Sequence, residues 1–246
     1  MVEIVPIQDL PEICSGDPLG ELLAAASSPG DGDVLVVSQK VVSKAEGRVR
    51  RLADVRPGER AQELAAQLDK DPALVQLALE ESRAVIRAVD GVLITETIGG
   101  WICANAGIDA SNVAEEGTVT LLPLDADASA RRLRAEVRDA CGRSPAVVIA
   151  DSFGRPWRLG QSDVAIGCAG IDPLDDWRGR TDRGERNLTA TVIALADELA
   201  AAADLAREKD SGAPAVLIRG LDRHVRADDG PGAVAIQRPP PDDLFR

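Results

Sequence analysis

Short runs of Val, Ile, Leu and Ala alternate along the chain with polar segments rich in Gly, Pro and Asp. Runs of this kind predict buried β-strands. We expect strands at 2–7, 34–37, 91–95, 117–122, 146–150 and 215–220, with a further apolar element at 164–171. Helical spacing of Leu, Ala and Val predicts helices at 19–26, 60–69, 72–82, 128–140 and 188–208. Strands and helices mix without the strict alternation of a parallel doubly wound sheet, which predicts the α+β class.

No low-complexity linker divides the 246 residues, and nothing repeats at the period of a solenoid. We therefore treat 1–246 as one module. The helices at 60–69 and 72–82 are expected to form a hairpin on the surface, because Pro72 suits the first turn of a helix. The proline-rich tail at 238–246 is expected to lack regular structure.

The polar segment after the run at 146–150 carries the clearest candidate chemistry. Asp151 and Ser152 come where that strand is expected to end. Carboxylate and hydroxyl oxygens are ligands that hard cations such as Mg²⁺ prefer. Arg155 and Arg158 follow, and an arginine can bind phosphate or carboxylate through two parallel hydrogen bonds. On this segment alone, a functional site and a solvated turn are equally good interpretations.

Two other polar clusters follow a strand or a run of small residues. One follows the strand at 34–37 and the other follows the glycine-rich segment at 99–107. The three clusters together contain Gln39, Lys40, Lys44, Asp109, Asn112, Asp151, Ser152, Arg155, Arg158, Gln161 and Asp163. Acids, hydroxyls, amides and cations in one chain suit metal-assisted phosphoryl or acyl-phosphate chemistry. This combination favours an enzyme over a binding module.

Composition limits the partners. The net charge of −13 and the pI near 4.6 argue against nucleic acid, because phosphate binding needs a basic face. An acidic protein that binds a nucleotide needs a divalent metal between its carboxylates and the phosphates. The 4 cysteines form no CxxC pair, which indicates free thiols in a reducing compartment. No apolar stretch reaches membrane-spanning length, so we expect a cytoplasmic protein with no membrane partner.

Common catalytic signatures are absent from the sequence. There is no GxxxxGK[ST] phosphate loop, no GxGxxG after a strand and no GxSxG elbow. The only histidine, His224, lies in a charged segment and is expected at the surface. Ser-His-Asp and Cys-His mechanisms are therefore disfavoured, because each needs a histidine base in the site.

Several phrases resemble the coenzyme F420-0:L-glutamate ligase family, also called the F420 gamma-glutamyl ligases. They lie at 42–48, 104–112, 151–161, 196–205 and 243–245, in the order that the family has them. The resemblance covers essentially the whole chain. It implies an intertwined α+β fold with mixed or antiparallel sheets, in which the single module consists of two interwoven subdomains. It also implies a homodimer.

The resemblance further implies an activity and its residues. Members of the family use GTP, Mg²⁺ or Mn²⁺, and K⁺ to add L-glutamate to the deazaflavin coenzyme precursor F420-0, through an acyl phosphate. The positions that match the GTP contacts are Leu10, Pro11, Glu12, Ile13, Gln39, Lys44 and Asn112. The positions that match the metal ligands are Asp109, Asp151 and Ser152. Our hypothesis is that Lys44 acts on the phosphates, and that Arg155 and Arg158 grip a substrate carboxylate or phosphate.

Two departures from the family pattern leave alternatives open. The segment 97–100 lacks the basic residue or histidine that relatives often carry there. Asn187 stands where an acid of a second metal site is expected, and Glu185 is its nearest substitute. One alternative is a related ligase that uses another amino acid or acceptor. Another is a non-catalytic protein that binds a nucleotide or a deazaflavin.

Overall fold

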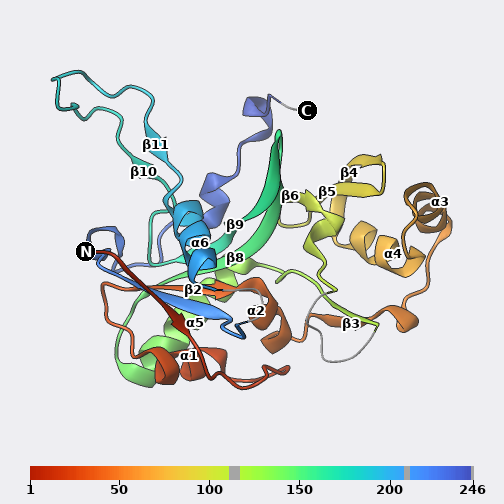
Figure 1. Cartoon of the computed structure of the whole chain (residues 1–246), viewed down its shortest axis with the longest axis horizontal. Coiled ribbons are helices and arrows are strands. Elements are labelled where there is room, and N and C mark those ends of the chain that lie inside the picture. The colour runs from red at the N-terminus through yellow and green to blue at the C-terminus, as the bar shows by residue number, and fades with distance from the viewer. Residues whose placement is uncertain (111–116, 208–210, 245–246) are drawn as a thin grey trace.

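A five-stranded mixed sheet forms the centre of the computed structural model, which describes residues 1–110, 117–207 and 211–244. Its strands, in spatial order, are β1 (Glu3–Ile7), β12 (Ala215–Arg219), β2 (Val34–Ser38), β8 (Ala146–Arg155) and β9 (Arg158–Ala169). Only β2 and β8 run parallel, and the other neighbours are antiparallel. Figure 1 shows the β8–β9 hairpin rising well beyond the other strands of this sheet.

Helices cover both faces of this sheet. Helices α1 (Leu19–Ser27) and α5 (Ala126–Cys141) pack on one face, and α6 (Leu195–Ala206) packs on the other. Successive residues of a strand point to opposite faces, so Leu35 lies in the first core and Val36 in the second. Burial on both faces explains why β2 is apolar at every position up to its last.

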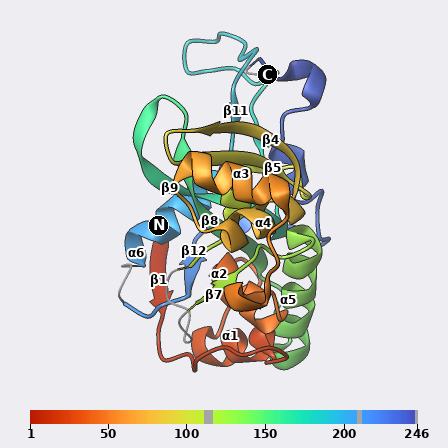
Figure 2. The ribbon, with the colours of Figure 1, turned by 90° about the vertical axis from the view of Figure 1, so that its right-hand side faces the viewer.

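A separate three-stranded antiparallel sheet lies at the right-hand end of the molecule in Figure 1 and faces the viewer in Figure 2. It consists of β4 (Ser82–Val89), β5 (Val92–Thr97) and β6 (Ile102–Ala104). Helices α3 (Glu59–Leu68) and α4 (Pro72–Glu80) pack against it around a small core of their own. The predicted pair of helices is confirmed. Strand β4 was not predicted, because none of its residues is fully buried and two register shifts break its alternation.

The remaining elements are short. Helix α2 (Gln39–Ala45) follows β2 directly, and two-residue strands β10 (Asp175–Asp176) and β11 (Val192–Ile193) form the base of an arm. Strand β3 (Val49–Arg51) pairs with β7 (Thr118–Thr120). The 3-10 turns are η1 (Leu52–Asp54), η2 (Asn105–Gly107), η3 (Asp222–His224), η4 (Ala233–Ile236) and η5 (Pro240–Asp242). The α+β class with mixed and antiparallel sheets is confirmed. The division into two subdomains stays a prediction.

Three expected boundaries were wrong. The apolar element expected at 164–171 is part of a longer strand, because β9 starts at Arg158. The strand at 146–150 does not end at Asp151, because β8 continues to Arg155 as half of the hairpin with β9. Beyond the sheet, a two-stranded ribbon has no face to bury, so its residues can be polar without ending the strand. The last helix starts at Leu195, well after position 188, because the preceding segment belongs to the arm and to β11. No helix in the described part of the chain is long and apolar enough to cross a membrane.

Candidate functional site

A cavity of about 920 Å³ opens where the carboxyl end of β2 meets β8. The end of a parallel strand pair is a common place for a ligand in sheets with helices on both faces. Nine of the predicted site residues line this cavity: Leu10, Pro11, Glu12, Ile13, Gln39, Lys44, Asp109, Asp151 and Ser152. They come from the loop after β1, from α2, from the segment after η2 and from β8. Asn112 lies outside the described residues.

Asp109 is placed by an unusual turn. Asn105, Ala106 and Gly107 all have positive φ, of 49°, 55° and 70°. Only glycine adopts such a conformation without strain, and a Cβ on Gly107 would lie 2.7 Å from the Leu122 side chain. After this turn the backbone N–H of Asp109 donates to the Thr120 carbonyl at 3.0 Å, and the Thr120 N–H donates back at 2.9 Å. The turn and this bridge fix Asp109 at the cavity.

Asp151 and Ser152 are placed by strand register. Ser38, the last residue of β2, pairs with Ala150, so Asp151 is the first residue of β8 beyond the parallel ladder. Helix α2 begins at that same point. Its side chain Gln39 is 1% exposed and accepts a hydrogen bond from Ser43 Oγ at 3.0 Å. The parallel pairing of β2 and β8 therefore brings the polar clusters that follow the two expected strands to the same end of the sheet.

Two lysines of α2 bind acids around the cavity. Lys40 Nζ lies 2.8 Å from Asp109 Oδ2, and Lys44 Nζ lies 2.5 Å from Glu12 Oε1. Both lysine side chains are largely buried, whereas the Glu12 side chain is mostly exposed. The Lys44 pair ties α2 to the loop at 10–13. Both lysines line the cavity.

Asp151 has the most perturbed carboxylate of the site. Its pKa is raised from 3.8 to about 7, chiefly by burial and in smaller part by the negative charges of Asp163 and Asp109. The Ser152 backbone N–H and the Lys40 charge lower its pKa but do not cancel the burial. A cation that binds beside such a carboxylate stabilises its charged form.

The residues present suit a hard divalent cation with few protein ligands. Asp109 and Asp151 supply carboxylate oxygens, and Ser152 supplies a hydroxyl. Within the described ranges, no three His, Cys, Asp or Glu side chains form a group that could hold a metal by themselves. A Mg²⁺-type site fits this limitation, because that ion usually takes one or two carboxylates and completes its shell with water and substrate phosphates.

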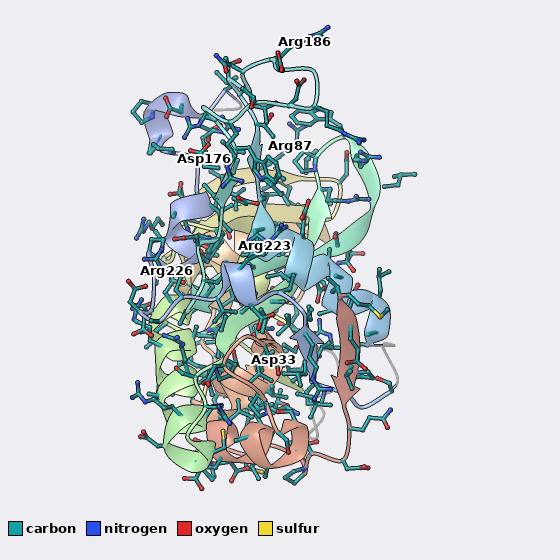
Figure 3. All side chains as sticks on the ribbon, turned by 90° about the vertical axis from the view of Figure 1, so that its left-hand side faces the viewer. Asp33, Arg87, Asp176, Arg186, Arg223 and Arg226 are labelled. Carbon is teal, nitrogen blue, oxygen red and sulfur yellow. The ribbon has the colours of Figure 1, made fainter. Side chains whose placement is uncertain are left out.

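Other candidate residues do not line the cavity. Arg155 and Arg158 lie on either side of the β8–β9 turn, and Arg155 Nη2 donates to the Leu159 carbonyl at 2.8 Å. Asn187 and Glu185 belong to the arm between β10 and β11, whose far end is marked by Arg186 in Figure 3. His224 is half-buried on η3, where burial and the Arg223 charge lower its pKa.

The structure adds residues that the predicted site set lacked. Lys40 and Asp163 were noted only as part of the polar clusters, and Arg207 had no signal beyond its place near the end of a helix. All three line the cavity. Lys40 comes shortly after a buried strand, so the tendency of functional residues to lie at strand ends could have singled it out. Arg207 is brought in by α6, and the packing of α6 on the sheet is not readable from the sequence.

Comparison with known proteins identifies the family of this chain. The profile of the F420-0:Gamma-glutamyl ligase family matches residues 8–220. The chain belongs to this family. Similar relatives include proteins named coenzyme F420:L-glutamate ligase from three organisms. The Methanothermobacter thermautotrophicus protein is 40% identical, covering 100% of this chain and 99% of the relative. The Archaeoglobus fulgidus protein is 46% identical over 90% and 88% of the two chains, and the Methanopyrus kandleri protein 43% over 100% and 97%.

Membership of the F420-0:gamma-glutamyl ligase family makes the chain a ligase. The family match runs through the loop at 10–13, through α2 and through β8, which are the elements that surround the cavity. The residue roles that the family resemblance implies stay predictions.

Proposed function

We propose that this chain is a GTP-dependent ligase that adds L-glutamate to coenzyme F420-0 through an acyl phosphate. One observation carries the proposal. Asp109, Asp151, Ser152 and Lys44 meet in one cavity, in a chain whose relatives are named coenzyme F420:L-glutamate ligases. Carboxylates and a lysine in a cavity of this size are what a nucleotide with its metal requires.

The reaction has two balanced steps. First, a carboxylate oxygen of the acceptor attacks the γ-phosphorus of GTP, the bond to the bridging oxygen breaks, and GDP leaves with that electron pair. Second, the amine of glutamate attacks the acyl carbon, the carbon–oxygen bond to phosphate breaks, and a proton is released as the amide forms. Positioning and charge neutralisation supply most of the catalysis in such a transfer.

The chain contributes charge and orientation. Mg²⁺ or Mn²⁺, together with K⁺, would neutralise the negative charge of the phosphates. Asp109, Asp151 and Ser152 would hold the divalent ion. Lys44 offers a compact positive charge to the phosphates from α2. The loop at 10–13, Gln39 and Asn112 contact the nucleotide. Arg155 and Arg158 grip a substrate carboxylate or phosphate from the β8–β9 hairpin, and the acting form is a homodimer.

The test is incubation of the purified protein with F420-0, GTP, Mn²⁺ and L-glutamate, followed by mass spectrometry. We expect products that carry added glutamyl units, and GDP formation that needs both the acceptor and the amino acid. Formation of GDP only with another amino acid or acceptor would indicate a related ligase. Absence of turnover with every acceptor would contradict the proposal and favour a binding protein.

Asp151→Ala tests the site itself. The variant is expected to lose glutamate addition and to keep its fold. Asp176→Ala is the matched control, because Asp176 pairs with Arg178 on the exposed arm seen in Figure 3, outside the cavity. Full activity of the Asp151→Ala variant would overturn the metal-site assignment.

A further inference from the structure

A buried carboxylate holds the Ser152 hydroxyl. Ser152 and Asp163 are directly opposed on β8 and β9, and Ser152 Oγ donates to Asp163 Oδ1 at 2.6 Å. Asp163 is only 2% exposed. A hydroxyl has one proton and two lone pairs. Because the proton is committed to Asp163, the lone pairs of the Ser152 oxygen are directed elsewhere.

Arg207 fixes that carboxylate. Arg207 directly follows α6 as its C-cap, and its Nη2 forms an ion pair with Asp163 Oδ2. The Arg207 side chain is itself 9% exposed. Each oxygen of Asp163 therefore has its own donor, the Ser152 hydroxyl on one and the Arg207 guanidinium on the other. A buried carboxylate needs such partners, since an unpaired one is costly.

We propose that Asp163 and Arg207 are positioning residues for the metal site: Asp163 takes the Ser152 proton, Arg207 holds Asp163, and the Ser152 oxygen is thereby presented to a divalent cation beside Asp151. The inference rests on the proposed function, because it gives these residues a task in the metal site of that reaction. Carboxylates that orient metal ligands through hydrogen bonds recur around metal sites, and losing one lowers metal affinity about 10–100-fold.

The first test measures Mn²⁺ binding to the metal-free full chain by electron paramagnetic resonance. Ser152→Ala and Asp163→Ala are each expected to weaken Mn²⁺ binding about 10–100-fold. The double variant is expected to bind no more weakly than Ser152→Ala alone, because Asp163 acts through Ser152. Losses that multiply in the double variant, or unchanged binding by Asp163→Ala, would overturn the proposal.

The second test grades the side chain at position 207. Arg207→Met removes the charge and is expected to weaken Mn²⁺ binding as Asp163→Ala does. Arg207→Lys keeps the charge without the planar fork and should restore part of the affinity. Wild-type affinity in Arg207→Met would overturn the role of Arg207. The matched control is Asp229→Ala, which removes the carboxylate partner of the buried Arg134. This ion pair lies outside the cavity, so the variant should leave Mn²⁺ affinity unchanged. Thermal unfolding of each variant reports whether it folds.

Asp151→Ala separates the failure of this inference from the failure of the proposed function. Equal Mn²⁺ binding by the wild type and Asp151→Ala would contradict the metal site of the proposed function. Loss of Mn²⁺ by Asp151→Ala, with full binding by Asp163→Ala, would contradict only the positioning role.

Discussion

Lys40 Nζ lies 2.8 Å from Asp109 Oδ2, so an ammonium group stands beside one of the two carboxylates proposed to bind the metal. The same positive charge lowers the pKa of Asp151, the other carboxylate. Lys40 and a divalent cation are both attracted to this negative charge. In the proposed metal site, Lys40 would therefore partly fill the electrostatic role of the ion while no metal is bound.

Lys40→Met is expected to make Mn²⁺ binding about tenfold tighter in the absence of nucleotide, because one charge-assisted contact is worth about 1.5–3 kcal/mol. The metal-free variant should also be less stable than the wild type. Calorimetric titration with Mn²⁺ and urea denaturation measure the two effects. Arg143→Met, which breaks an exposed pair with Asp31, should change neither by much. Weaker Mn²⁺ binding by Lys40→Met would show that Lys40 does not compete with the ion.

Asp151 makes the metal-free protein less stable as the pH rises. Its pKa is about 7 in the folded chain against 3.8 as the ordinary value, so the folded state keeps a proton that the unfolded state has lost between these values. The contribution of Asp151 to stability is therefore fully present below about pH 4 and is lost as the pH rises to about 7.

Asp151→Asn should remove this dependence. In buffer that contains a chelator, the free energy of unfolding of the variant at pH 8 is expected to exceed that of the wild type by up to a few kcal/mol. One pKa unit corresponds to about 1.4 kcal/mol. The advantage should shrink as the pH falls toward 4. Saturating Mn²⁺ should stabilise the wild type and not the variant. Urea denaturation at a series of pH values measures these differences, and an advantage that grows toward low pH would contradict the raised pKa.

Lys44→Ala is expected to weaken GTP binding about 10–100-fold, because a hydrogen bond from a charged donor contributes about 1.5–3 kcal/mol. Lys44 lines the cavity and is held by Glu12 in the loop at 10–13. Calorimetric titration with GTP and Mn²⁺ provides the measurement. Lys70→Ala is the control, since Lys70 lies between α3 and α4, outside the residues that line the cavity. Equal effects of the two substitutions would exclude a specific role of Lys44.

Gly107→Ala should disturb Asp109 as well as the fold. Gly107 has φ +70°, and a Cβ there would lie 2.7 Å from Leu122. Gly142 has φ +72° at the end of α5, with open space around its Cβ position. Gly142→Ala should therefore cost only the backbone strain, about 1 kcal/mol, whereas Gly107→Ala should cost more and also weaken Mn²⁺ binding. Urea denaturation and Mn²⁺ titration compare them, and equal losses of stability would argue against the clash.

Arg155 and Arg158 test whether the β8–β9 hairpin takes part in substrate binding. If the two guanidinium groups grip the acceptor, Arg158→Ala should raise KM for F420-0 about tenfold or more and leave GTP affinity unchanged. Arg155→Ala should also loosen the turn, because Arg155 donates to the Leu159 carbonyl. Steady-state kinetics with each substrate varied in turn gives both values. An unchanged KM in Arg158→Ala would remove that residue from the binding hypothesis.

Local patterns along the chain predicted most elements. The β2 and β8 runs, the α3–α4 pair and the α+β class are confirmed, because β-branched runs, helical spacing and a proline at a helix start are local signals. The sequence missed β4, which has no fully buried residue and therefore no clear alternation, and it ended β8 too early. Polar residues mark the end of a strand only where a longer strand would be buried. The part of the β8–β9 hairpin that extends beyond the sheet is not buried, so polar residues there do not end the strand.

The sequence by itself determined which residues could do the chemistry: Asp109, Asp151, Ser152 and Lys44 follow from residue type, strand ends and family resemblance. Only the tertiary structure decided how they are held. The pairs Ser152–Asp163, Arg207–Asp163 and Lys40–Asp109 join residues from separate elements. Their meeting depends on hairpin register, on the packing of α6 and on the left-handed turn before Asp109. Contacts between distant segments arise from the packing of whole elements, and no local pattern encodes them.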